Sequence, residues 1–118
     1  KEQITKLIMA EEHAAAYIES AEEFQETLAS NAVVVVDFTA SWCGPCQMIA
    51  PIYEDMAKAN QAIKFVKVDV DKLDDVAAQC GVSCMPTFQF FVGGEKKDEL
   101  QGASKDALAA KVAKYTPA

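Results

Sequence analysis

Apolar side chains recur along the chain with the periods of strands and of helices. Residues 33–38 form a nearly continuous β-branched run, which predicts a central strand covered on both faces. Residues 63–68 alternate between apolar and polar side chains, as a second strand would. Between them, residues 45–59 predict a long amphipathic helix that Pro51 should kink. The first half of the chain therefore indicates a parallel strand–helix–strand unit.

Capping residues place two further helices. Ser20 and Glu23 form a capping box, which begins a helix that ends near Ala29. A short helix over residues 73–79 is followed by Gly81, a residue that suits the left-handed conformation beyond a helix C-terminus. Both helices flank the predicted strands in the order that crossover connections need.

The last part of the chain indicates an antiparallel hairpin and a terminal helix. Gly93-Gly94 separates residues 87–92 from residues 96–101, which is a strong hairpin signal. Ser104 then caps a helix with three inward side chains: Leu108, Val112 and Tyr115. With a short apolar piece over residues 16–18, the order β-α-β-α-β-α-β-β-α predicts an α/β fold. Its central mixed β-sheet is flanked by helices on both faces.

Residues 1–14 are interpreted as an extension that precedes a domain over residues 15–118. Ile4, Leu7 and Ile8 lie at helical spacing, so we expect a short amphipathic helix there. Packing of this helix on its own domain is the expectation, and binding to a partner is the alternative.

Composition supports a single domain and narrows the range of partners. The 118 residues are 51% apolar, which is enough for a core without disulfide staples or a metal. A net charge of -7 and the lack of arginine argue against nucleic acid and anionic membranes as partners. No apolar run is long enough to cross a bilayer. Without a signal-peptide pattern we expect a cytoplasmic protein, and an organelle after loss of a targeting segment is the alternative.

Cys43 and Cys46 stand between a predicted strand and a predicted helix. Cys43 would lie at the helix N-terminus, where free backbone N–H groups and the helix dipole stabilise a thiolate and lower the thiol pKa. Pro45 suits the first helical turn, and Gly44 leaves room for a substrate backbone. Cys46, one turn further on, would lie deeper and could attack a mixed disulfide formed at Cys43. This arrangement predicts thiol–disulfide exchange.

Two other interpretations of the cysteines remain open. Cys43 and Cys46 could bind zinc together with Cys80 and Cys84, because the four thiols are two closely spaced pairs. The first pair, however, begins a long helix rather than lying on a tight turn. The cysteines could also be inert core residues, but that would not explain the run Trp-Cys-Gly-Pro-Cys. The sequence favours redox chemistry with no metal.

Five segments of the chain resemble the thioredoxin family. They are Val-Asp-Phe-Thr-Ala-Ser-Trp-Cys-Gly-Pro-Cys (36–46), Met-Ile-Ala-Pro (48–51), Lys-Val-Asp-Val-Asp (67–71), Met-Pro-Thr-Phe (85–88) and Gly-Ala-Ser-Lys (102–105). The extra cysteines and Met-Pro-Thr-Phe resemble the eukaryotic cytosolic, h-type members more than bacterial ones. The resemblance implies a thioredoxin fold and a protein-disulfide reductase that cycles Cys43 and Cys46 between dithiol and disulfide.

Asp37 is the charged residue of the apolar strand, and burial should raise its pKa toward neutrality. An exposed position on an edge strand is the alternative. The resemblance implies that Asp37 lies beneath the cysteines and accepts the proton of Cys46, with Lys67 on the next strand tuning it. We expect Asp37→Asn to slow disulfide reduction while the fold stays intact.

The resemblance also implies a binding surface for substrates. Pro86 would follow a cis peptide bond, and the backbone of Met85 would pair with an extended substrate strand. The surrounding apolar surface would consist of Trp42, Gly44, Pro45, Met85, Gly102 and Ala103. Gln47 departs from the family, since many members have a basic residue there, which weakens charge complementarity with acidic targets.

Cys80 and Cys84 are candidate regulatory thiols, with inert packing as the alternative. Cys84 precedes Met85-Pro86, so its oxidation, glutathionylation or pairing with another molecule would block substrate docking. We expect a monomer that can form an oxidised dimer through Cys84.

The resemblance implies no bound cofactor. Electrons would come from NADPH through thioredoxin reductase, or from a ferredoxin-dependent reductase in a plastid. Targets would be disulfide-containing proteins such as peroxiredoxins. A disulfide oxidase or isomerase is one rival interpretation, although Gly-Pro between the cysteines favours reduction. A binding module in which the chemistry is incidental is the other rival.

Overall fold

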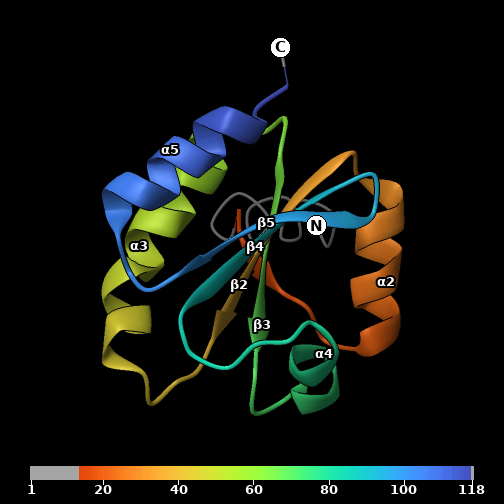
Figure 1. Ribbon diagram of the computed structural model, residues 1–118, viewed down its shortest axis with the longest axis vertical. Coiled ribbons are helices and arrows are strands. Elements are labelled where there is room, and N and C mark those ends of the chain that lie inside the picture. Colours follow the sequence, from red (N-terminus) through yellow and green to blue (C-terminus); the bar gives the residue numbers. More distant parts are fainter. Residues whose placement is uncertain (1–13, 118) are drawn as a thin grey trace, which may run out of the picture.

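The computed structural model describes residues 14–117, which build one five-stranded sheet in the order β1-β3-β2-β4-β5 (Figure 1). The parallel part joins β2 to β3 and β3 to β1, and the antiparallel part joins β2 to β4 and β4 to β5. The strands are β1 (Ala16–Tyr17), β2 (Val33–Thr39), β3 (Lys64–Asp69), β4 (Thr87–Val92) and β5 (Glu95–Gln101). The helices are α2 (Ala21–Ser30), α3 (Gly44–Ala59), α4 (Asp74–Gln79) and α5 (Lys105–Tyr115). The predicted order and fold class are confirmed.

Strand β2 lies at the centre of the sheet, and all of its residues are buried. Helices α3 and α5 cover one face, and α2 and α4 cover the other (Figure 1). Because successive side chains of a strand point to opposite faces, Val35 packs with α3 and α5 while Val34 and Val36 pack with α2 and α4. This explains why the predicted strand is a continuous apolar run rather than an alternating one.

The predicted capping residues lie where the sequence places them. Ser20 Oγ accepts the backbone N–H of Glu23 at 3.1 Å, and Ser104 Oγ accepts that of Ala107 at 3.2 Å. Gly81 has a φ of 70°, the left-handed conformation predicted for the end of α4. Helix α3 continues on both sides of Pro51. The predicted helix before residue 14 lies outside the described residues.

Tyr53 anchors α3 to the centre of the sheet. Its ring is completely buried, with centroids 5.4 Å from Phe65 and 5.5 Å from Phe88. Its hydroxyl shares one proton between the carbonyl oxygens of Val66 at 2.8 Å and Val35 at 3.0 Å. Helix α3, which begins after Cys43 and contains Cys46, is therefore fixed to β2 and β3 through a satisfied buried polar group.

Candidate redox site

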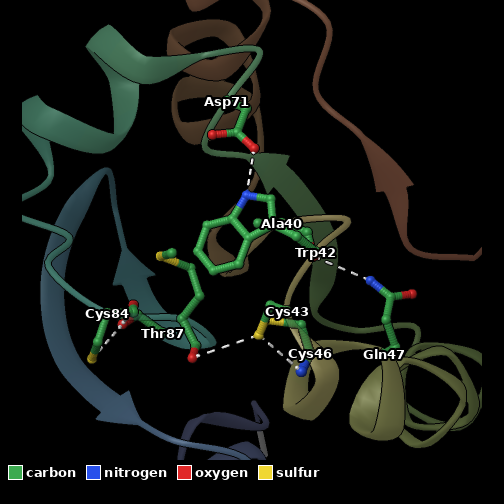
Figure 2. Close-up of a disulfide and its surroundings, with 9 residues drawn as sticks. Ala40, Trp42, Cys43, Cys46, Gln47, Asp71, Cys84 and Thr87 are labelled. Carbon is green, nitrogen blue, oxygen red and sulfur yellow. Dashed lines mark hydrogen bonds between the residues drawn. A yellow bond between two sulfur atoms is a disulfide. The ribbon is translucent and has the colours of Figure 1, made fainter.

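The loop between β2 and α3 brings Cys43 and Cys46 together. Cys43 is the N-cap residue of α3, and the two cysteines form a disulfide with their Cα atoms 5.3 Å apart. The sulfur of Cys43 also accepts the backbone N–H of Cys46 at 3.2 Å (Figure 2). The Cys43 sulfur therefore accepts a hydrogen bond from one of the free N–H groups at the N-terminus of α3. Such a bond stabilises the thiolate of Cys43 once the disulfide is reduced.

The two cysteines differ in their exposure to solvent. Cys43 retains 6% of its surface exposed, whereas Cys46 retains 1%. Gly44 and Pro45, the first residues of α3, are exposed beside Cys43. A thiol partner can therefore approach Cys43 more readily than Cys46.

The loop before β4 faces the disulfide. The Met85–Pro86 peptide bond is cis, as the resemblance implied, and the sulfur of Cys43 lies 3.7 Å from the Met85 carbonyl oxygen. The N–H of Gly102 donates to the Pro86 carbonyl at 2.9 Å, which brings the loop of Gly102 and Ala103 beside this segment. Residues from three separate parts of the chain thus surround Cys43.

Trp42 is held on the surface of the site by an acidic residue. Its side chain is 66% exposed, and its indole N–H donates to Asp71 Oδ2 at 2.8 Å (Figure 2). The position of Trp42 agrees with the exposure expected from the sequence. Sequence reasoning did not single out Asp71, although the residue ends the acidic motif over residues 67–71.

Gln47 and Met48 also contribute to the site, through contacts that the sequence did not predict. Gln47 Nε2 donates to the carbonyl of Ala40 at 3.2 Å, which ties the first turn of α3 to the loop before Trp42. Met48 is 77% exposed and, with Pro45 and Ala103, lines a shallow cleft of about 190 Å³. The apolar surface beside Cys43 therefore extends along α3.

Asp37 lies inside the sheet, so the alternative of an exposed edge position is wrong. Its side chain is 1% exposed, and its Oδ1 atom has no hydrogen-bond partner among the described residues. Burial raises the pKa of Asp37 to about 7, and the positive charge of Lys67 opposes this increase. The predicted direction of the pKa shift is confirmed. Lys67 is the register partner of Asp37 on β3.

Cys80 and Cys84 are half-buried free thiols that precede Met85 in the chain. Cys80 ends α4, and burial raises the pKa of its thiol. The sulfur of Cys84 lies 3.8 Å from the Thr87 hydroxyl, whose proton is donated to the Cys84 carbonyl at 2.6 Å (Figure 2).

Within residues 14–117, no group of three or more cysteine, histidine or acidic side chains is arranged to hold a metal ion. In the same range, no helix has the length and apolar composition needed to cross a membrane.

The chain is similar in sequence to known proteins of one family. Residues 15–114 match the family model described as Thioredoxin. The chain is 52% identical to thioredoxin of Equus caballus over 97 residues, which cover 80% of this chain and 92% of the horse protein.

Solved structures give the same result. The structure of Plasmodium falciparum thioredoxin superposes with a TM-score of 0.84 at 40% identity, covering 86% of this chain and 99% of that one. A chain from a structure on the thiol-resolving mechanism of a yeast mitochondrial 1-Cys peroxiredoxin via glutathione and thioredoxin systems has a TM-score of 0.81 at 33% identity. That match covers 85% of this chain and 94% of the yeast chain.

Proposed function

Because the chain belongs to the thioredoxin family and is a thiol–disulfide oxidoreductase, we propose that Cys43 is its nucleophile and Cys46 its resolving thiol. The observation that carries this assignment is the difference between the two cysteines in exposure and in position. Cys43 is the more exposed one and lies at the N-terminus of α3, while Cys46 is almost completely buried one turn later. The direction of the reaction is reduction of disulfides in other proteins.

The exchange proceeds in two balanced steps. The Cys43 thiolate attacks one sulfur of the target disulfide, so that a mixed disulfide forms and the other target sulfur leaves as a thiolate. The thiolate of Cys46 then attacks the sulfur of Cys43. This step releases the second target sulfur and leaves Cys43 and Cys46 oxidised, while the target has gained two electrons and, after protonation, two protons.

Asp37 is proposed to accept the proton of Cys46 in the second step. It lies on the face of the sheet that α3 covers, and burial brings its pKa to about 7, where a carboxylate can both take up and release a proton at neutral pH. Lys67 is proposed to tune this residue, because its positive charge favours the ionised carboxylate.

The apolar surface around Cys43 is proposed to bind the target. Met85 offers its backbone to an extended target segment next to the cis-Pro86 bond, in the manner of an added strand. The neighbouring side chains that would contact the target are Trp42, Gly44, Pro45, Gly102 and Ala103. The exposed indole of Trp42 and its bond to Asp71 support this role.

Membership of the family also supports proposals for the partners of this protein and for the source of its electrons. NADPH would supply electrons through a thioredoxin reductase, and the targets would include peroxiredoxins; the yeast structure associates a thioredoxin system with such a protein. The match over residues 15–114 supports treating residues 15–118 as the catalytic domain and residues 1–14 as an extension. A cytoplasmic location and a monomeric state complete the proposal.

Insulin reduction with NADPH and a thioredoxin reductase tests the proposed direction. We expect turnover that depends on both cysteines, and a reduction potential near about -270 mV, the value typical of a thioredoxin. A potential of about -180 to -120 mV would instead favour the oxidase or isomerase interpretation. Full biological activity of Cys43→Ser and Cys46→Ser variants would favour a binding module.

Cys84 is proposed as a regulatory thiol at the edge of the target-binding surface. It immediately precedes Met85, so a glutathione or a second chain attached to its sulfur would occupy the space of a docked target. We expect glutathione disulfide to add one glutathione to Cys84 and to lower the rate of insulin reduction, and Cys84→Ser to keep the full rate. Mass spectrometry that finds Cys43–Cys46 as the one oxidised site would contradict the proposal.

A further inference from the structure

Side chains from neighbouring strands form a row across the face of the sheet that α3 covers. Tyr17 on β1 is the register partner of Lys67 on β3, which is the register partner of Asp37 on β2. Register partners point to the same face of a sheet. An aromatic ring, an ammonium group and a carboxyl group therefore follow one another from the edge of the sheet to its centre.

Exposure to solvent decreases along this row. Tyr17 is 47% exposed, Lys67 is half-buried, and Asp37 is buried. At the edge of the sheet, Tyr17 and Lys67 line a cleft of about 520 Å³ together with Pro51 and Glu54 of α3. The flexible stem of Lys67 can thus direct its ammonium group outward to the cleft or inward to the carboxyl group.

The structure shows the outward position. Lys67 Nζ lies 4.6 Å from the centroid of the Tyr17 ring, which is within the range of a cation–π interaction. Within residues 14–117, no ion pair of 4.0 Å or less joins Lys67 to Asp37. The Oδ1 atom of Asp37 has no hydrogen-bond partner there either.

We propose that Tyr17 is a positioning residue whose ring holds the Lys67 ammonium group at the edge of the sheet, away from the Asp37 carboxyl group. The inference rests on the proposed role of Asp37 as proton acceptor. From this position, the positive charge of Lys67 offsets only part of the increase that burial causes in the pKa of Asp37, which stays at about 7. A direct ion pair would lower the pKa of Asp37 further and make the carboxylate a weaker base.

Within residues 14–117, the other ionisable groups near this row do not provide a second cation. Tyr53 and Glu54 of α3 are acidic groups, as is Glu19, which lines the same cleft. Glu54 is already engaged, since its carboxylate accepts the backbone N–H groups of Ala14 at 2.7 Å and Ala15 at 3.0 Å. Phe88, the register partner of Asp37 on β4, is apolar, and Cys46 of α3 carries a thiol only after reduction.

Titration of Asp37 in the oxidised protein tests the inference. The pKa would be measured from the carbon-13 shift of the Asp37 carboxyl group. We expect Tyr17→Leu to lower this pKa by about half a unit, because the ammonium group is released toward the carboxylate. Tyr17→Phe, which keeps the aromatic face, should leave the pKa as in the unaltered protein.

A double variant separates this mechanism from a general change in structure. Lys67→Met should raise the pKa of Asp37, and Tyr17→Leu added to Lys67→Met should have no further effect. An unchanged or higher pKa in Tyr17→Leu would overturn the inference, and so would an equal decrease in the Lys67→Met background. The titration needs no turnover. A protein that failed to reduce insulin would disprove the proposed function while leaving the measured effect of Tyr17 on the carboxyl group valid.

Discussion

Replacing Cys46 with serine should stop turnover and leave the protein covalently attached to its targets. Cys43 would still attack a target disulfide, but no neighbouring thiol could then resolve the mixed disulfide. A well-oriented intramolecular thiol can reach an effective concentration on the order of 10⁵ M, about 10⁸ times a millimolar external thiol, so its loss should make release too slow to observe during an assay. Intact-mass spectrometry after mixing the variant with insulin should show the adduct, and dithiothreitol should remove it.

The other cysteines supply the controls for this experiment. Cys43→Ser should give neither turnover nor adduct, because Cys46 is 1% exposed and cannot reach a target in its place. Cys80→Ser should behave like the unaltered protein, because Cys80 lies at the end of α4 and burial raises the pKa of its thiol, which disfavours the reactive thiolate. Turnover retained in Cys46→Ser, or an adduct formed by Cys43→Ser, would reverse the assigned roles.

Replacing Asp37 with asparagine should stabilise the oxidised protein at high pH and slow the reduction of target disulfides. The pKa of Asp37 is about 7 in the folded protein against the ordinary 3.8. Between these values the unfolded chain loses its proton first, so folded stability decreases as the pH rises from about 4 to 7. Below this window the carboxyl group is neutral in both states, and above it the difference is constant.

Asparagine keeps the volume of the side chain but does not ionise. We therefore expect the free energy of unfolding of Asp37→Asn to exceed that of the unaltered protein by about 4 kcal/mol at pH 8, and by almost nothing at pH 4. Urea unfolding at several pH values measures this difference. Asp55→Asn is the matched control, because it removes the same charge from an exposed position on α3 and should give a small effect at both pH values.

The same variant tests the chemistry of resolution. Without Asp37, the thiol of Cys46 loses its proposed proton acceptor, so release of a target from the mixed disulfide should slow most near neutral pH. Single-turnover rates measured from pH 6 to 9 would show this change. Rates equal to those of the unaltered protein across that range would count against the proton-accepting role, even if the predicted stabilisation were observed.

Local sequence signals predicted the elements of this fold because their causes are local. The β-branched run of β2, the serine caps at Ser20 and Ser104, and Gly81 beyond α4 each act through neighbouring backbone groups. Where a predicted boundary differs from the observed one, the difference is one residue, as for the strand predicted over residues 63–68 and observed as Lys64–Asp69. The hydrophobic pattern also determined that Asp37 is buried, since the strand around it is apolar on both sides.

The sequence alone also determined the chemistry, because Cys43-Gly-Pro-Cys46 between a strand and a helix is sufficient to predict a thiolate at a helix N-terminus. What surrounds those sulfurs was decided by tertiary structure. The contact of Cys43 with Met85, the bond of Trp42 to Asp71, and the row from Tyr17 to Asp37 join residues that are distant in the chain. Strand order and register bring such residues together, and register arises from packing of the whole sheet, which no short segment specifies.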